Sequence, residues 1–110
     1  MREVIDQVAR DKSPKPLFVP LRTEFFELFE NGSKCIEYRL YGDRWNENTC
    51  FEGRPITLSH GYGKQRRLHR HIKNFAKRLG SELPPEDQSA VISVYGRLDV
   101  SLACIEVTLA

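Results

Sequence analysis

The sequence has only three cysteines, Cys35, Cys50 and Cys104, and they form no C-x-x-C pair and no finger-like spacing with histidine. This pattern predicts neither a disulfide framework nor a zinc site, and we expect no metal and no cofactor. An odd number of widely separated cysteines fits a protein of the reducing cytosol. Cys35 and Cys104 lie in apolar runs, where a buried thiol behaves as a small hydrophobic group rather than as a nucleophile.

Long apolar runs are also missing. No stretch approaches the roughly 20 apolar residues of a membrane helix, and residues 1–6 carry acidic side chains where a signal peptide would be apolar. We therefore expect a cytoplasmic protein without a membrane partner. With 110 residues, 40% of them apolar and 10% aromatic, the chain is long enough for one domain with its own core.

Acidic residues are absent between Gly53 and Ser81, although the chain contains 15 of them. The same stretch carries eight basic residues, so the rest of the chain has a net charge of −6. Such an asymmetry attracts polyanions, because each basic side chain that neutralises a phosphate releases counterions. A solvated basic face is the alternative interpretation. The eight residues are Arg54, Lys64, Arg66, Arg67, Arg70, Lys73, Lys77 and Arg78.

Prolines and glycines divide the chain into elements. Apolar residues at helical spacing in 1–11, followed by the prolines of 13–16, predict an N-terminal helix and a stiff connector over 1–16, ahead of one domain over 17–110. Within the domain, Thr23 is placed to cap a helix that Asn31 and Gly32 end. The apolar face of that helix would be Phe25, Phe26, Leu28 and Phe29. The remaining predictions are strands over 17–21, 34–41, 55–59 and 102–109, a loop over 42–53, and a helix over 86–95 that Gly96 closes.

One segment, residues 66–79, fits two structures. At 100° per residue its apolar side chains fall on one side and Arg66, Arg70, Lys73 and Lys77 on the other, which predicts an amphipathic helix. As a strand, the segment would place Arg66 and Arg70 on the same face as apolar residues. Periodicity alone favours the helix.

The run Gly32-Ser33-Lys34-Cys35-Ile36-Glu37-Tyr38-Arg39 follows the expected helix, and a strand leading into Gly61-Tyr62-Gly63 comes after it. This G-x-K-x-x-E-x-R motif and its surroundings resemble the ASCH group of PUA-like proteins, of the small single-domain prokaryotic or phage type. The resemblance covers most of residues 17–110. It implies an α+β fold, a small PUA-like β-barrel with flanking helices, and it implies a further strand over 66–75, which we adopt in place of the helix.

Strand alternation places Glu37 and Arg39 on one face. Lys34 falls on the opposite face of an ideal strand, and a bulge near Gly32 would redirect it towards Glu37. An ion pair across the barrel is the purely structural interpretation of Glu37 and Arg39. The resemblance instead implies a polar cleft beside this strand that takes nucleic acid or nucleosides.

Binding of RNA or a nucleoside is therefore the function we expect first. Tyr62, Tyr41 and Trp45 are possible stacking platforms for an unpaired base, or else packing residues. The oligomeric state is left open. The nucleic-acid contacts expected are Arg39, Tyr62, Lys64, Arg66, Arg67 and Arg70.

Two other classes of function stay open. Some small ASCH proteins hydrolyse acetylated cytidine with a Lys at the position of Lys34, a Thr three residues later and a Glu from a following helix, for which Glu86 is the candidate. Here Glu37 replaces the Thr and removes the hydroxyl nucleophile, which argues against the amidohydrolase mechanism. Lys34 and Glu37 are the candidate catalytic residues. A ribonuclease could use Lys34, Arg39, Tyr62 and His60. Alternatively, residues 1–11 could dock the chain onto a protein partner.

Overall fold

The computed structural model describes residues 14–110; the expected N-terminal helix of residues 1–11 lies outside this range. The described residues form an α+β fold, as predicted, with five strands, two α-helices and a short 3-10 turn at Gly80–Glu82. No helix in this part of the chain is long and apolar enough to cross a lipid bilayer. The elements are β1 (Leu17–Leu21), α2 (Thr23–Glu30), β2 (Ile36–Leu40), β3 (Pro55–His60), β4 (Arg67–Leu79), α3 (Pro85–Tyr95) and β5 (Ser101–Val107).

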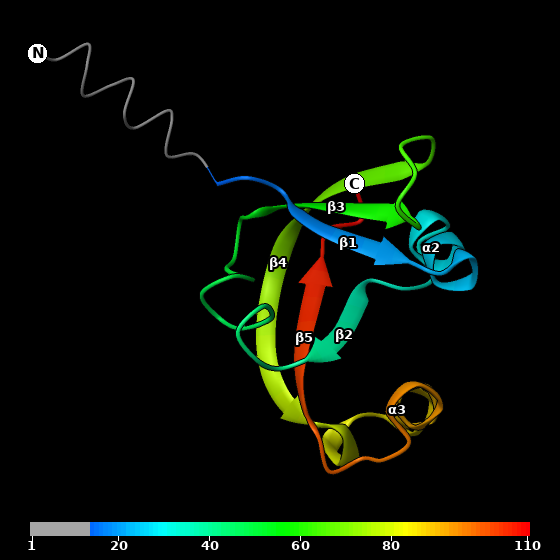
Figure 1. The fold of residues 1–110 in the computed structure, drawn as a ribbon, viewed down its shortest axis with the longest axis vertical. Coiled ribbons are helices and arrows are strands. Elements are labelled where there is room, and N and C mark those ends of the chain that lie inside the picture. Colours follow the sequence, from blue (N-terminus) through cyan, green and yellow to red (C-terminus); the bar gives the residue numbers. More distant parts are fainter. Residues whose placement is uncertain (1–13) are drawn as a thin grey trace, which may run out of the picture.

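The five strands form one curled sheet in the order β1-β3-β4-β5-β2. β1 pairs with β3 in parallel, and all other neighbours are antiparallel. The sheet bends into a half-barrel (Figure 1), so that β1 and β2 are its two edges. The backbone ladder therefore stops short of a closed barrel.

β4 confirms the strand implied by the family resemblance, and the helix predicted from periodicity is wrong. The strand pairs with β3 over its first part and with β5 over its second, with a register irregularity between Ile72 and Asn74. Leu68 and Ile72 contribute to one apolar core, and beyond the irregularity the adjacent residues Phe75 and Ala76 pack into two different cores. A strand that shifts its alternation and then buries both faces reproduces a helix-like spacing of apolar residues.

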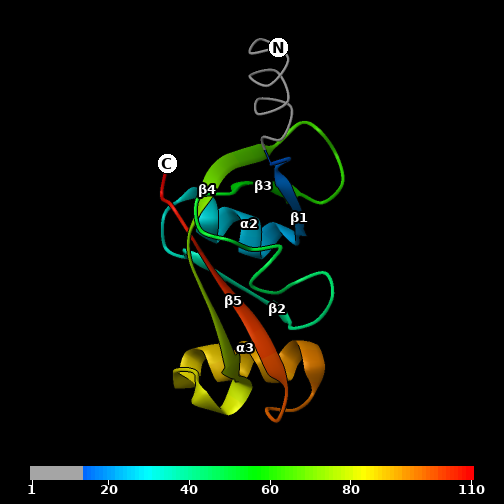
Figure 2. The same ribbon diagram turned by 90° about the vertical axis from the view of Figure 1, so that its left-hand side faces the viewer.

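The two cores lie at opposite ends of β4 and β5. In the larger core, Phe26 and Phe29 of α2 pack with buried residues of β1 and β3 and with the C-terminal end of β5. The smaller core packs Val91 of α3 against Leu102 and Cys104 of β5. Figure 2 shows β4 and β5 running side by side from the region of β1 and β3 to α3.

The helix ends agree with most of the sequence signals. Gly32 and Gly96 adopt φ of +83° and +76° after α2 and α3, as the predicted left-handed helix ends require. Thr23, however, is the first residue of α2 rather than its cap, a position that Arg22 occupies without a side-chain bond. The Thr23 hydroxyl is instead 2.7 Å from Nε2 of His60. Leu28, assigned to the apolar face, is 39% exposed.

All three cysteines have free thiols. Cys50 and Cys104 are buried, and burial raises the pKa of both thiols, so these side chains stay protonated and unreactive near neutral pH. Cys35 is half-buried and immediately precedes β2. The packing role expected for Cys104 is therefore confirmed.

Candidate functional site

A cleft of about 250 Å³ lies between the two edge strands of the sheet, with α2 and α3 on either side of it. Its wall is mostly apolar, with charged groups from β2 and from the junction of β1 and α2. This combination of apolar walls and a few polar groups is typical of a site for a small organic ligand. The lining residues are Pro20, Leu21, Arg22, Phe25, Lys34, Glu37, Tyr38, Arg39, Ala90, Val91, Val94 and Tyr95.

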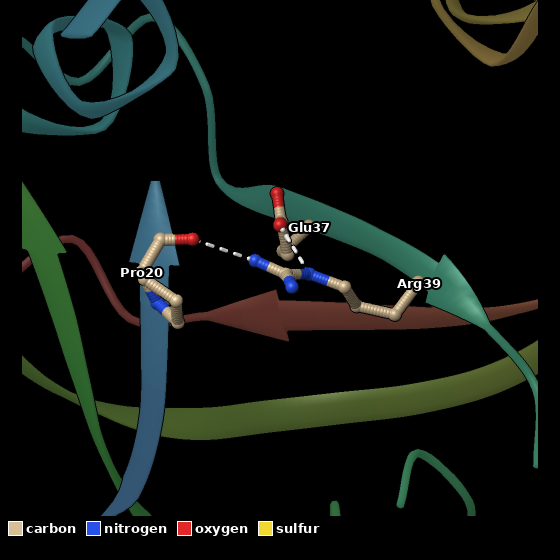
Figure 3. Close-up of polar contacts among 3 residues, drawn as sticks. All are labelled: Pro20, Glu37 and Arg39. Atoms are coloured by element: carbon tan, nitrogen blue, oxygen red, sulfur yellow. Dashed lines mark hydrogen bonds and ion pairs between the residues drawn. The ribbon is translucent and has the colours of Figure 1, made fainter. Parts of the chain in front are cut away.

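Arg39 connects the two edges of the sheet. Its Nε donates to Oε2 of Glu37 at 2.8 Å, and its Nη2 donates to the carbonyl oxygen of Pro20 on β1, also at 2.8 Å. Figure 3 shows the guanidinium reaching from β2 towards β1. The guanidinium also lies 5.0 Å from the ring centroid of Trp45. A side chain thus joins the strands where the backbone ladder is interrupted, and we call this arrangement the Arg39 clasp.

Glu37 and Arg39 share a face of β2, as alternation predicted, but their ion pair runs along one strand rather than across a barrel. The side chain of Glu37 is only 10% exposed, and that of Arg39 is 24% exposed. Burial raises the pKa of Glu37 above its ordinary value, while the charges of Arg39 and Lys34 act in the opposite direction. The protonation state of the Glu37 carboxyl group therefore depends on the balance between its burial and the positive charges of Arg39 and Lys34.

Lys34 reaches the same cleft without the bulge that we expected. β2 pairs with β5 in continuous register from Ile36 to Leu40, and Lys34 lies before the strand, with its amide bonded to the Leu28 carbonyl at 3.0 Å. Because the residue precedes the pleated region, alternation does not restrict its direction. Its Nζ lies 5.2 Å from the ring centroid of Tyr38 and 5.5 Å from that of Phe29. The ammonium group is thus held among aromatic rings.

The second wall of the cleft is attached through Tyr38. The Tyr38 hydroxyl donates to Oδ2 of Asp87 at 2.8 Å, which links β2 to the first turn of α3. Burial, together with this bond, raises the pKa of Tyr38. Glu86, the candidate for a catalytic helical Glu, is not among the residues that line the cleft. The expected Glu86 contribution is therefore not supported by the geometry.

A second, shallower groove of about 540 Å³ adjoins the cleft and shares Pro20, Leu21, Arg22 and Arg39 with it. The groove continues over the start of α2 and the turn after β3, where it is lined by Thr23, His60, Gly61 and Tyr62. The Tyr62 side chain is prominent on this surface because the residue is 81% exposed, and its ring centroid lies 6.0 Å from that of Phe18.

The other basic residues expected to contact nucleic acid lie outside the cleft and the groove. Arg66 pairs with Glu30 of α2 at 2.8 Å. Arg67 donates from Nε to the Gly63 carbonyl at 3.1 Å and lies over the ring of Phe18. Lys64 is exposed in the turn, and Arg70 is half-buried, with a bond to the carbonyl of its neighbour. Lys64, Arg66 and Arg67 thus lie in or next to the turn after β3, whereas Arg70 lies further along β4, opposite Ile56 near the start of β3.

Tyr41 and Trp45 are engaged in other contacts. The Tyr41 hydroxyl bonds to Glu47, and Nζ of Lys77 lies 4.2 Å from its ring centroid. Trp45 packs against the larger core, and the guanidinium groups of Arg39 and Arg44 both lie over its ring. Of the three aromatic platforms considered, Tyr62 is the one that lines a groove.

Sequence reasoning missed the Pro20 carbonyl, Arg22 and the α3 wall. A backbone carbonyl leaves no signal in a sequence. Arg22 was not recognised as a site residue because the helix cap was predicted at Thr23 instead. The α3 residues Ala90, Val91, Val94 and Tyr95 have helical spacing, but without ionisable groups in that face they suggest only a core. Within residues 14–110, no three potential metal ligands lie together.

Comparison of the chain with models of known protein families finds no match, and comparison with curated proteins finds no similar sequence.

Proposed function

We propose that the protein binds unpaired RNA and holds one nucleobase in the cleft beside β2. The observation that carries this proposal is the convergence of Lys34, Glu37 and Arg39 on one cleft whose remaining wall includes the rings of Phe25 and Tyr38. Unpaired bases are recognised by aromatic or apolar contact with their faces together with hydrogen bonds to their edges. A carboxylate acceptor beside cationic donors complements a base edge that presents both kinds of group.

The dimensions of the cleft support a ligand of about one base. Pockets for drug-sized ligands enclose about 300–1,000 Å³, and this cleft is slightly smaller, at about 250 Å³. The resemblance of residues 32–39 to the ASCH motif and the half-barrel sheet agree with the same use. We propose on these grounds that the fold is of the PUA-like kind.

Hydrolysis is the second candidate function, and the burial that raises the pKa of Glu37 is the observation in its favour. A carboxyl group with a raised pKa could exchange a proton with a ligand in the cleft. Glu37 stands where a hydroxyl nucleophile would be needed for the amidohydrolase mechanism, so a ribonuclease is the form of hydrolysis that the residues allow.

The experiment is a titration of a labelled 12-nucleotide single-stranded RNA, followed by fluorescence anisotropy at several salt concentrations. We expect Lys34→Ala and Arg39→Lys to weaken binding by about tenfold each, the effect of one charge-assisted hydrogen bond. Arg97→Gln is the matched control, because Arg97 pairs with Asp99 and lies outside the cleft and the groove. Binding that is equal for all four proteins would overturn the proposal.

The same samples also separate the other functions. Gel analysis after incubation detects strand cleavage, and loss of cleavage in Glu37→Gln with binding retained would assign a ribonuclease. RNA binding should weaken steeply with salt, since it depends on counterion release. Docking of a protein through residues 1–11 would leave RNA affinity independent of the cleft variants.

A further inference from the structure

The groove next to the cleft has the composition of a phosphate subsite. It is lined by Arg22, Arg39 and His60, together with the hydroxyl of Thr23, and it has no acidic residue in its wall. Among the residues that line the cleft or the groove, Glu37 is the one acidic residue, and it lines the cleft and not the groove. Guanidinium groups are the side chains best suited to phosphate recognition, because they present several donors in one plane.

Arg39 belongs to both hollows and retains donors for a ligand. A guanidinium has five N–H donors, and within the described residues Arg39 uses one for Glu37 and one for Pro20. Three donors are left to reach a group in the cleft or in the groove. Because the Arg39 clasp and its contact with Trp45 fix the guanidinium in place, little entropy is lost when these donors bind a ligand.

The far end of the groove presents an exposed aromatic ring. Tyr62 is 81% exposed, and Phe18 lies beside it with the Arg67 guanidinium 5.2 Å from the Phe18 ring centroid. An exposed Tyr ring that rests against a second aromatic ring is suited to stacking with a base. The molecular surface therefore presents a small cleft, a cationic groove and an aromatic ring in sequence.

From this order of features we infer that the ligand is a pair of consecutive unpaired nucleotides, with one base in the cleft, the phosphate between Arg22 and Arg39, and the neighbouring base on Tyr62. The inference rests on the proposed function and narrows it to a nucleotide strand, which excludes a free nucleoside as the preferred ligand. The phosphate supplies affinity and the cleft supplies base recognition, which is the usual division between backbone and base contacts.

The experiment compares four homodinucleoside monophosphates (A, C, G and U) with the corresponding nucleosides and with methylphosphonate analogues, whose linkage carries no charge. Binding is measured by chemical-shift titration of the ¹⁵N-labelled full chain. We expect the best dinucleotide to bind at least about tenfold more tightly than its methylphosphonate analogue, the loss of one charge-assisted contact. Arg22→Gln should reduce this difference, because only Arg39 then remains at the phosphate, and Arg22→Lys should restore part of it. Tyr62→Ala should weaken dinucleotides while leaving nucleosides unaffected.

The outcomes distinguish this inference from the proposed function. Equal affinities for a dinucleotide, its methylphosphonate and its nucleoside, all reduced by Arg39→Lys, would overturn the phosphate subsite while the cleft remains a base site. Binding of the 12-nucleotide RNA without detectable binding of any dinucleotide would likewise overturn the two-nucleotide ligand alone. Absence of binding for RNA and dinucleotides would overturn both. Arg22 is exposed, so its variants are expected to fold.

Discussion

Replacement of Arg39 by methionine tests whether a side chain closes the seam of the half-barrel. Methionine keeps most of the apolar stem but removes the bonds to Glu37 and to Pro20, each 2.8 Å long. Hydrogen bonds to charged groups contribute about 1.5–3 kcal/mol each, and removal of one partner from a buried ion pair costs about 3–5 kcal/mol. Since Arg39 is 24% exposed, water replaces part of the loss. We therefore expect the unfolding free energy to fall by about 3 kcal/mol.

Urea unfolding measures this loss directly, and Trp45 is the only tryptophan of the chain, so its fluorescence reports on the site itself. With an m-value of about 1.5 kcal/mol/M, the midpoint should fall by about 2 M. Circular dichroism must give the same midpoint for the two-state treatment to hold.

Arg44→Met is the matched control for this experiment. Arg44 lies over the same Trp45 ring, at 5.3 Å, but is exposed, so its loss should cost at most about 1 kcal/mol. In a Glu37→Gln background the Arg39→Met change should cost less, because no buried carboxylate is left without a partner. Equal losses for Arg39→Met and Arg44→Met would refute the clasp.

Three further changes test other parts of the molecule. Burial raises the folded-state pKa of Glu37 above 4.5, so the folded protein binds this proton more tightly than the unfolded chain does. The stability of the wild type should therefore fall relative to that of Glu37→Gln as the pH rises from 4.5 through the folded-state pKa. Parallel pH profiles of the urea midpoint for the two proteins would contradict this. Gly80→Ala should cost about 1–3 kcal/mol in thermal or urea unfolding, because the added Cβ would lie 2.9 Å from a backbone carbonyl, whereas Gly42→Ala meets nothing within 4 Å and should be close to neutral. Tyr38→Phe should lower the free energy of unfolding by about 1 kcal/mol, because the hydrogen bond to Asp87 is lost. The amides of α3 should also exchange faster than in the wild type, and unchanged exchange would contradict the link between β2 and α3.

Local chemistry made much of the fold predictable from the sequence. Strand β1 matches the predicted 17–21, and Gly32 and Gly96 end their helices because a left-handed residue is needed there. β2 is shorter than the predicted 34–41, since pairing with β5 starts only at Ile36. Signals of this kind depend on neighbours in the chain, which a sequence displays directly.

The features that could not be predicted depend on tertiary partners. β4 looks helical because its apolar residues serve two cores, and no local rule reveals which core each residue joins. The joint position of Glu37 and Arg39 followed from alternation alone, whereas the partner of Arg39 on β1 is a backbone carbonyl that becomes visible only when the sheet curls. The groove around Arg22 likewise arises from the approach of two segments distant in the chain.

The strand order also governs how the chain can assemble. Among the four strand pairs, β3 and β4 alone are joined by a short turn, with Ser59 opposite Arg67. The partners of β1 and β2 are far along the chain: β1 pairs with β3, and β2 pairs with β5, with Ile36 opposite Glu106. Loop closure of such distant pairs costs entropy before their contacts form, and domains dominated by them fold in milliseconds to seconds rather than microseconds. We therefore expect both edge strands to join the β3–β4 hairpin and β5 late, so that the cleft, which needs both edges, is among the last parts of the molecule to be completed.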